Sequence, residues 1–409
     1  MNFGAIDHGN PCKPVSFSKL IAYFTELRYR IPLDYVTQGN VALRLDEFGY
    51  DLPPERIAQR PLEQRDASRM LLLDRKSGHF QDRVFRDFPG LLKGNELIVV
   101  NNARVLPARL FGRRAGIHAQ PVGKNSPIRK QNLSTDIEIL LLRCVAGDEW
   151  EALVRPGRKI SVGETISFGN GELKAEVTSR GSYGQRTLVF SSGGNVRERI
   201  DRLGHVPLPP YIRREDEPSD RERYQTVFAQ RGSAVAAPTA GLHFTTEILD
   251  ELRRRGVEIR EITLDVGLGT FEPIRTECLE DHAIHKESYE IPPETAQALV
   301  RAKNNGRPVL AIGTTVVRAL EDAAEKASRS GNHDKTPLSP GRFEAEIFLY
   351  PGKPFRVVDQ LLTNFHLPRS SLLALVSAFA GRENILRAYR HAVEANYRFY
   401  SYGDCMWIR

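Results

Sequence analysis

The sequence predicts an α/β core domain, split along the chain, with a small antiparallel β-barrel domain inserted into it. Two patterns lead to this prediction. Between residues 103 and 192, short β-type runs alternate with clusters of Gly, Asn and Asp, as is typical of small antiparallel barrels. From residue 193 onwards, helical and strand-like segments alternate, which indicates an α/β sheet with some parallel strands.

The predicted domains follow from these boundaries. Residues 1–43 are an N-terminal extension whose role the sequence does not indicate. The α/β domain covers residues 44–102 and 193–409, and the barrel domain covers residues 103–192 between its two parts.

Individual elements are predicted from apolar spacing and from the turn residues that separate them. A helix is expected to start at residues 51–57, because Pro53 and Pro54 suit the first turn of a helix. Strands are expected at residues 70–74, 96–100, 137–143, 149–154, 159–166, 172–178, 186–190, 257–266, 309–312 and 344–349. Helices are expected at residues 247–255, 294–303, 316–328, 371–380 and 382–395.

Composition excludes several classes of protein. With 409 residues, 41% apolar and 27% charged, the chain is too apolar and too mixed in charge to be disordered. Its longest apolar stretch, residues 372–380, is far shorter than the roughly 20 residues of a membrane-spanning helix, and no signal peptide is recognisable. The four cysteines are scattered without a CxxC motif, which argues against a disulfide framework and a zinc ribbon. A cytoplasmic protein without a membrane partner is therefore expected.

Positive charge is concentrated in one segment. The chain has 58 Lys plus Arg and 51 Asp plus Glu, which gives a net charge of +7. Residues 101–135 contain no acidic residue, and this pattern favours a polyanionic partner, although a solvated basic loop explains the charge equally well. The basic residues of the segment are Arg104, Arg109, Arg113, Arg114, Lys124, Arg129 and Lys130.

Four segments place Gly, Thr, His or acidic residues where predicted strands end, which is where α/β sheets bind ligands. In the first, residues 236–245, Thr239 and Gly241 precede His243, and Thr245 or Thr246 can cap the next helix. The helix start favours an anionic ligand group and a lowered pKa for His243. A capped turn with a packed histidine is the alternative.

The second segment, residues 264–271, is similar to the acidic, glycine-containing loop with which common methyltransferases hold S-adenosylmethionine. Its candidate residues are Asp265, Gly267, Gly269 and Thr270. Such a loop should be followed by a helix, and Pro273 disfavours one. The local structure is therefore expected to differ from that of a standard methyltransferase.

The third segment, residues 281–287, carries His282, His285 and Glu287. A metal site is one interpretation, but the histidines lack the HExxH order, so no metal is expected. Because imidazole titrates near neutral pH, an acid or base role for His285 or Glu287 is favoured.

The fourth segment, residues 312–318, joins a strand through Gly-Thr-Thr to a helix. Free backbone N–H groups and the hydroxyls of Thr314 and Thr315 then lie at a helix start, which suits a carboxylate, although ordinary capping is the alternative. The absence of GxxxxGK[ST] excludes a triphosphate-binding P-loop. Residues 364–373 add His366, and the aromatic residues 397–402 either stack a base or form a core strand.

Taken in order, these segments resemble the S-adenosylmethionine:tRNA ribosyltransferase-isomerase family of queuosine biosynthesis, over about residues 44–409. The resemblance rests on LDEFGYDLPPERIAQRPLEQRDASRMLLLDR from Leu45, VVNNARVLPARLFG from Val99, GHVPLPPYI from Gly204, RYQTVFAQRGSAVAAPTAGLHFT from Arg223, DVGLGTFEPI from Asp265, HAIHKE from His282, AIGTTVVRALE from Ala311 and TNFHLPRSSLL from Thr363. One departure is residues 113–135, which are longer than the equivalent family segment and lack its usual glycine-rich turn.

The resemblance implies an α/β domain interrupted by a β-barrel and an enzyme that needs no metal or other cofactor. It implies that S-adenosylmethionine is a co-substrate that donates its ribosyl moiety and not its methyl group. This moiety is transferred to the 7-aminomethyl-7-deazaguanine base at the tRNA wobble position and isomerised. Epoxyqueuosine then remains in the anticodon loop, adenine and methionine are released, and a monomer is expected.

Roles are assigned from side-chain chemistry and motif position. We expect proton transfer by His243, His285 and Glu287, and an electrostatic or ribose-hydroxyl contact by Asp265. Residues expected to bind S-adenosylmethionine are Thr239, Gly241, Gly267, Gly269, Thr270, Thr314, Thr315 and Arg318, the last as a bidentate partner of the methionine carboxylate. Residues expected to contact tRNA phosphates are Arg104, Arg109, Arg113, Arg114, Arg129 and Lys130.

Two other functions stay open on the sequence alone. A tRNA methyltransferase would release S-adenosylhomocysteine, whereas the ribosyl transfer releases adenine and methionine. A non-catalytic RNA-binding protein would bind tRNA without consuming S-adenosylmethionine.

Overall fold

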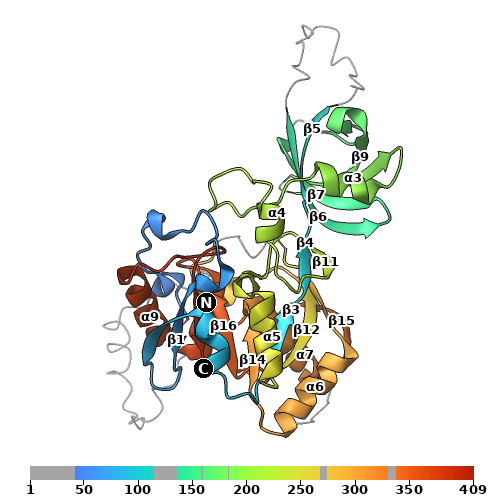
Figure 1. Cartoon of the computed structure of the whole chain (residues 1–409). Coiled ribbons are helices and arrows are strands. Elements are labelled where there is room, and N and C mark those ends of the chain that lie inside the picture. Colours follow the sequence, from blue (N-terminus) through green and yellow to red (C-terminus); the bar gives the residue numbers. More distant parts are fainter. Residues whose placement is uncertain (1–41, 115–135, 158–159, 183, 268–273, 330–337) are drawn as a thin grey trace, which may run out of the picture. The chain divides into compact units, whose positions relative to one another are not determined.

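The structure, a computed structural model, describes residues 42–114, 136–157, 160–182, 184–267, 274–329 and 338–409. Residues Leu43–Arg409 form one compact unit, shown in Figure 1. The extension predicted for residues 1–43 lies almost entirely outside the described residues, as do residues 115–135.

The larger part of the unit is built on a nine-stranded mixed sheet of order β15-β13-β12-β3-β14-β16-β17-β1-β2. Its strands are β1 (Arg69–Leu73), β2 (Phe80–Val84), β3 (Leu97–Asn101), β12 (Glu258–Leu264), β13 (Glu287–Ile291), β14 (Val309–Ile312), β15 (Gly341–Ala345), β16 (Gln360–Asn364) and β17 (Cys405–Ile408). The four central strands, β12, β3, β14 and β16, are parallel. Their carboxyl ends therefore share one edge of the sheet, and the segments that follow them meet there.

Helices cover both faces of this sheet, because alternate strand residues point to opposite sides. Leu310 and Ile312 of β14 pack in a core with α2 (Phe88–Leu91) and α5 (Thr246–Arg254). Val309 and Ala311 pack in the opposite core. The helices of that core are α6 (Pro293–Asn304), α7 (Thr314–Arg329), α8 (Ser371–Ala380) and α9 (Arg382–Glu394).

The inserted part is a closed antiparallel barrel of order β10-β7-β6-β5-β8-β9. Its strands are β5 (Arg109–Arg114), β6 (Ile137–Ala146), β7 (Glu149–Arg155), β8 (Thr165–Phe168), β9 (Leu173–Arg180) and β10 (Gln185–Ser192). Every second residue over most of β6 and β7 is buried, and these residues fill the barrel interior. The helix α3 (Val196–Leu203) adds Val196 and Ile200 to this core. The predicted fold class, an α/β core with an inserted antiparallel barrel, is confirmed.

Details at the domain boundaries differ from the expected ranges. β4 (Ala103–Val105), which the sequence places in the barrel domain, pairs with β11 (Arg231–Ala234) in a separate two-stranded sheet. The short helix α4 (Asp220–Arg223) follows the barrel. The exact domain limits stay a prediction.

Some predicted elements have other bounds or another form. The strand expected at residues 344–349 is β15, which ends at Ala345, because Asp322 accepts the next two backbone N–H groups in place of a neighbouring strand. The helix expected at residues 51–57 is one short 3₁₀ turn, Pro54–Arg56. Residues 397–402 are buried irregular structure and not a strand for most of their length. In the described parts of the chain, no helix is long and apolar enough to cross a bilayer.

Candidate active site

A cavity of about 330 Å³ lies at the carboxyl ends of the parallel strands. Its walls come from the end of β16, from the segments that follow β12, β14 and β16, and from three loops that are remote in sequence, at residues 210–211, 236–240 and 400–401. These wall residues include residues 236–240, Val266, residues 313–315, residues 363–367, Tyr211, Tyr400 and Ser401. Three of the glycine- and threonine-containing segments singled out in the sequence therefore share one cavity.

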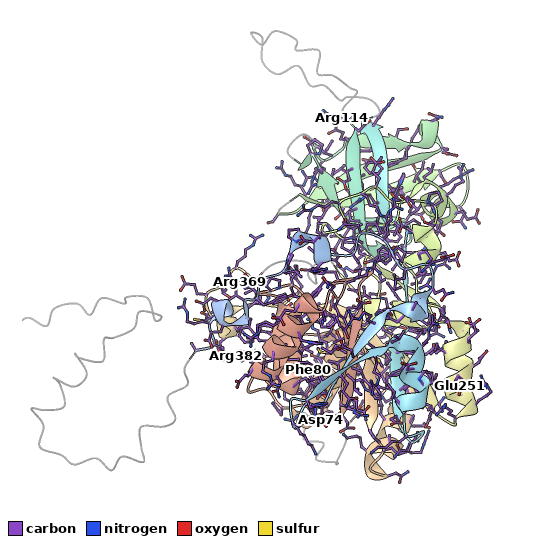
Figure 2. All side chains as sticks on the ribbon, turned by 60° about the vertical axis from the view of Figure 1, so that its left-hand side comes forward. Asp74, Phe80, Arg114, Glu251, Arg369 and Arg382 are labelled. Carbon is purple, nitrogen blue, oxygen red and sulfur yellow. The ribbon has the colours of Figure 1, made fainter. Side chains whose placement is uncertain are left out.

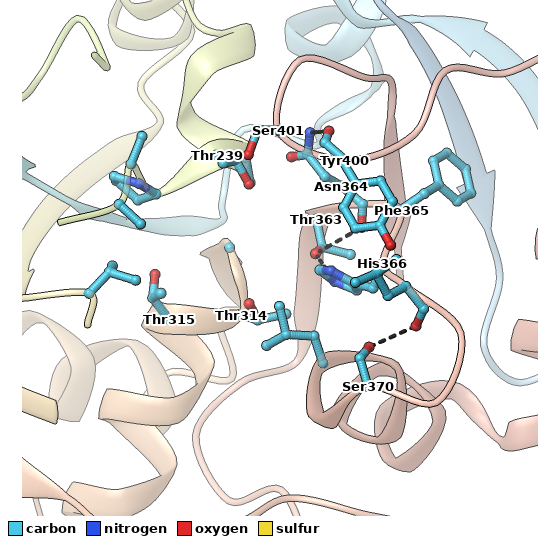
Figure 3. Close-up of a pocket in the computed structure, with 18 of the residues that line it drawn as sticks. Thr239, Thr314, Thr315, Thr363, Asn364, Phe365, His366, Ser370, Tyr400 and Ser401 are labelled. Atoms are coloured by element: carbon cyan, nitrogen blue, oxygen red, sulfur yellow. Dashed lines mark hydrogen bonds between the residues drawn. The ribbon is translucent and has the colours of Figure 1, made fainter. Parts of the chain in front are cut away.

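The start of α7 forms one side of this cavity. Gly313 adopts φ +99°, a conformation that favours glycine, and its N–H donates to Leu362 O on β16 at 2.8 Å. The helix then begins at Thr314, so its first backbone N–H groups and the hydroxyls of Thr314 and Thr315 lie beside the cavity. Figure 3 shows both threonines on this helix, with Thr363 and His366 on the neighbouring segment.

The described residues that line the cavity include no ionised side chain. His366 is the imidazole among them, and its Nε2 lies 2.9 Å from the Thr363 hydroxyl. Burial lowers the pKa of His366 to about 3, so its ring is neutral at physiological pH. A cationic ligand would therefore meet no positive charge on these lining residues.

A smaller hollow adjoins the cavity and shares Thr314, Thr315 and Leu372 with it. It contains the predicted residues His285, Glu287 and Arg318. The Glu287 carboxylate accepts Arg318 Nη1 at 2.5 Å and the Gly267 backbone N–H at 3.0 Å.

The Arg318 guanidinium is hydrogen-bonded to several protein groups. Besides Glu287, its guanidinium donates to the backbone carbonyls of His285, Ala345 and Ile347. Only 10% of its side chain is exposed. A bidentate contact with a ligand carboxylate would require Arg318 to break these hydrogen bonds. The predicted contact between Arg318 and the methionine carboxylate therefore needs a rearrangement of this side chain.

His243 does not line the cavity. Its Nδ1 lies 2.7 Å from Ser68 Oγ, and the ring borders a separate small hollow next to Arg65. Burial lowers the pKa of His243 to about 4, while the side chain of Asn364 acts in the opposite direction. The alternative interpretation of the sequence, a packed histidine before a capped helix, describes the observed surroundings, and Thr245 caps α5 through the Ile248 N–H.

The structure places the other predicted ligand contacts, Gly241, Asp265, Gly269 and Thr270, differently from one another. A Cβ on Gly241 would lie 2.6 Å from the Phe228 ring, so this glycine serves close packing and does not line the cavity. Asp265 follows β12, and its backbone N–H bonds Ser288 O at 3.0 Å, outside the cavity wall. Gly269 and Thr270 lie outside the described residues.

In the folded protein, three of the arginines predicted to contact tRNA form ion pairs with carboxylates. Arg109, Arg113 and Arg114 on β5 pair with Glu138, Asp136 and Glu164, which the sequence places outside the acid-free segment. Arg113 is nonetheless 75% exposed. Arg104 is exposed on β4, Arg114 is labelled at the end of β5 in Figure 2, and Arg129 and Lys130 lie outside the described residues.

Sequence reasoning did not assign several residues that line the cavity. Tyr211, Thr363, Asn364 and Ser401 were not predicted as ligand contacts, although GHVPLPPYI and TNFHLPRSSLL contain three of them. The aromatic run at residues 397–402 supplied the only signal for Tyr400. Among the described residues, no group of three His, Cys, Asp or Glu side chains is arranged to hold a metal ion.

Comparison with known proteins decides the family. A family profile described as "Queuosine biosynthesis protein" matches residues 45–408. The chain belongs to this family. The family resemblance found in the sequence is therefore confirmed.

Named relatives agree with this assignment. The S-adenosylmethionine:tRNA ribosyltransferase-isomerase of Solibacter usitatus is 52% identical over 368 residues, 90% of this chain and 100% of that protein. The protein of the same name from Moorella thermoacetica is 48% identical over 367 residues, again 90% of this chain and 100% of its own length. A crystal structure of S-adenosylmethionine tRNA ribosyltransferase from Thermotoga maritima is 34% identical, covers 89% of this chain and 100% of that one, and has a TM-score of 0.47.

Proposed function

We propose that this protein transfers and isomerises the ribosyl moiety of S-adenosylmethionine onto the 7-aminomethyl-7-deazaguanine base at the tRNA wobble position. The products are epoxyqueuosine in tRNA, adenine and methionine. The observation that carries the proposal is the convergence of the family's sequence segments on one cavity at the carboxyl ends of the parallel strands.

The electrostatics of the cavity suit S-adenosylmethionine. Its sulfonium is a fixed positive charge, and a protonated histidine beside it would oppose binding. The pKa of His366, which lines the cavity, is lowered to about 3, so its ring stays neutral. The α7 start, with Thr314 and Thr315, offers N–H and hydroxyl donors to the methionine carboxylate.

Proton transfer is needed twice in this reaction. A base removes a carbon-bound proton next to the sulfonium, and an acid protonates the departing adenine. We assign these roles to Glu287 and His285, because their hollow adjoins the cavity through Thr314 and Thr315. Each such group typically contributes about 10²–10⁴-fold to the rate.

The partners and conditions of the reaction belong to the same proposal. S-adenosylmethionine is a co-substrate, and no metal or other cofactor takes part. The protein acts as a monomer in the cytoplasm on the anticodon loop of tRNA. Arg104, Arg113, Arg129 and Lys130 contact phosphates, and Asp265, Gly267, Gly269 and Thr270 stay predicted contacts of S-adenosylmethionine.

The products distinguish this proposal from its rivals. The protein is incubated with S-adenosylmethionine and tRNA that carries the aminomethyl-deazaguanine base, and small molecules are followed by mass spectrometry. Adenine and methionine in equal amounts are expected. S-adenosylhomocysteine would indicate a methyltransferase instead, and unchanged S-adenosylmethionine with bound tRNA would indicate a non-catalytic RNA-binding protein.

A further inference from the structure

Tyr400 has an unusual backbone conformation at the cavity wall. Its φ is +71°, in the left-handed region that aromatic residues rarely adopt. Strained residues of this kind persist only when neighbouring groups hold them, and they gather at ligand sites. Tyr400 lines the cavity, so its strained backbone lies at the proposed ligand site.

Two donors fix the Tyr400 carbonyl. Asn364 Nδ2 donates to it at 2.9 Å, and the Gly403 N–H donates to it at 2.8 Å. The Tyr400 N–H in turn donates to Phe365 O at 3.3 Å. Both backbone groups of Tyr400 are therefore bonded to the end of β16: the carbonyl to its last residue, Asn364, and the N–H to the next residue, Phe365.

A second layer stands behind Asn364. The Asn364 Oδ1 and His243 Nε2 atoms are both buried and have no hydrogen-bond partner of good geometry among the described residues, although Asn364 influences the pKa of His243. His243 Nδ1 is held by Ser68, whose hydroxyl also reaches Arg65 O at 3.2 Å. Ser68 thus contacts His243, and Asn364 contacts the Tyr400 carbonyl, while no hydrogen bond of good geometry joins His243 to Asn364; these three buried polar side chains are called the row.

The strained backbone places the Tyr400 ring against Tyr211. The two rings stack with centroids 4.3 Å apart and planes 29° from parallel. Tyr211 is itself held by a 2.6 Å contact between its hydroxyl and Ser401 Oγ. Both tyrosines belong to the cavity wall, and neither ring relies on the ligand for its position.

We infer that the stacked pair Tyr211–Tyr400 is a preformed platform for a planar purine-type base, and that the row Ser68–His243–Asn364 positions it. The inference rests on the proposed function, in which two such bases take part: the adenine of S-adenosylmethionine and the deazaguanine of tRNA. Base stacking on an aromatic ring is sequence-tolerant and gains affinity mainly from the π-face. His243 is then a positioning residue that acts through Asn364.

Binding without turnover tests the platform. Adenosine, S-adenosylmethionine and free methionine are titrated calorimetrically into the wild type and into Tyr211→Phe, Tyr211→Leu and Phe355→Leu. Phe355 contacts Phe379 away from the cavity and is the matched control. Tyr211→Leu is expected to weaken adenosine and S-adenosylmethionine about 5- to 100-fold, whereas Tyr211→Phe retains the affinity. Methionine affinity is unchanged in all variants.

A second arm identifies the base. If adenosine binding is unchanged in Tyr211→Leu but the KM for tRNA rises by a similar factor, the platform holds the deazaguanine and not adenine. If neither changes in a folded Tyr211→Leu variant, the platform is refuted. Should Tyr211→Leu fail to fold, Tyr211→Met replaces it, because methionine fills similar space without an aromatic face.

A third arm tests the positioning row. Asn364→Leu is expected to weaken adenosine in the same direction as Tyr211→Leu, and combining it with His243→Phe should add little, because both changes release Tyr400. Additive losses would overturn the row. Adenosine binding does not require catalysis, so failure of the wild type to release adenine would refute the proposed function and leave the platform to be judged separately.

Discussion

Glu287 and Arg318 form an ion pair that is almost closed to solvent, with exposed side-chain fractions of 5% and 10%. The same carboxylate accepts the Gly267 N–H, so one side chain joins β13, α7 and the loop after β12. The pair therefore shapes the hollow beside the cavity as well as supplying a candidate base.

Glu287→Gln is expected to destabilise the fold and to lower activity. The amide still accepts the Gly267 N–H, but the Arg318 charge stays buried without its partner, which typically costs about 3–5 kcal/mol. Urea unfolding measures this destabilisation, and kcat measured under conditions where the variant is folded separates the catalytic effect. The double variant Glu287→Gln, Arg318→Met should recover part of the stability; if it is less stable than Glu287→Gln, the ion-pair explanation is wrong.

Stability should fall in mild acid because of the buried histidines. The pKa of His243 is about 4 in the folded protein and near 6.5 when unfolded, so the unfolded chain binds more protons between these values. Stability is then complete above pH 6.5 and is lost as the pH falls towards 4, by about 3 kcal/mol from His243. Urea midpoints at several pH values should show this slope, and it should be shallower in His243→Gln. An equal slope in both proteins contradicts the assignment.

The pH profile of activity tests a different property of the same residue. Because His243 is neutral and outside the cavity, His243→Gln should leave the acidic limb of kcat/KM in place. If His243 were the proton-transfer group, this limb would disappear and kcat would fall about 10²–10⁴-fold.

Thr314→Val is expected to weaken S-adenosylmethionine about tenfold or more. The variant removes a hydroxyl from the α7 start, and a hydrogen bond to a charged group is worth about 1.5–3 kcal/mol. Decarboxylated S-adenosylmethionine is the control ligand, since its affinity should be the same in both proteins. An equal weakening of both ligands would place the carboxylate elsewhere.

Gly241→Ala should affect stability and not ligand affinity. Its new Cβ would lie 2.6 Å from Phe228, and overpacking of this kind costs about 1–3 kcal/mol. Gly193→Ala is the matched control, because its new Cβ would have no heavy atom within 4 Å beyond its chain neighbours. Thermal unfolding and the KM for S-adenosylmethionine, measured on both variants, separate packing from binding.

The basic strand β5 predicts a salt-dependent contribution to tRNA binding. Arg113→Glu should lower the affinity and reduce the slope of log affinity against log salt concentration by roughly one unit for each phosphate that the protein no longer neutralises. Arg254→Glu on α5, also largely exposed, is the control and should change neither quantity. An unchanged slope in Arg113→Glu would exclude this residue from the interface.

Most of the fold could be predicted because the apolar spacing and the turn residues of most helices and strands are distinctive. The helices predicted at residues 294–303 and 316–328 match α6 and α7 to within two residues at each end. β2 could not be recognised, because it carries exposed polar residues. β17 was not predicted either, although it is fully buried and as long as β14. The strands on both sides of β17 are remote from each other in sequence, so no local pattern reports their pairing.

The site was predicted in part for a related reason. Thr239, Thr314 and Thr315 lie at strand ends, and topology alone brings such positions together. The sequence could not show that Glu138 and Glu164 neutralise the basic strand, because those pairs form only in the closed barrel. Nor could the sequence show that His243 lies outside the cavity, because the burial and the orientation of its side chain depend on tertiary packing.

The position of β17 sets the order in which the sheet can assemble. Cys405–Ile408 lie between β16 and β1, so the strand pair β1–β2 is hydrogen-bonded to the rest of the sheet only through residues 405–408. Until β17 pairs, one edge of β1 (Arg69–Leu73) lacks its neighbouring strand, and an open apolar edge of this kind is a template for pairing with other chains. Deletion of β17 (Cys405–Ile408) is expected to divide the sheet into the strand order β15-β13-β12-β3-β14-β16 on one side and the pair β1-β2 on the other. The open strand edges would then make the chain prone to aggregation.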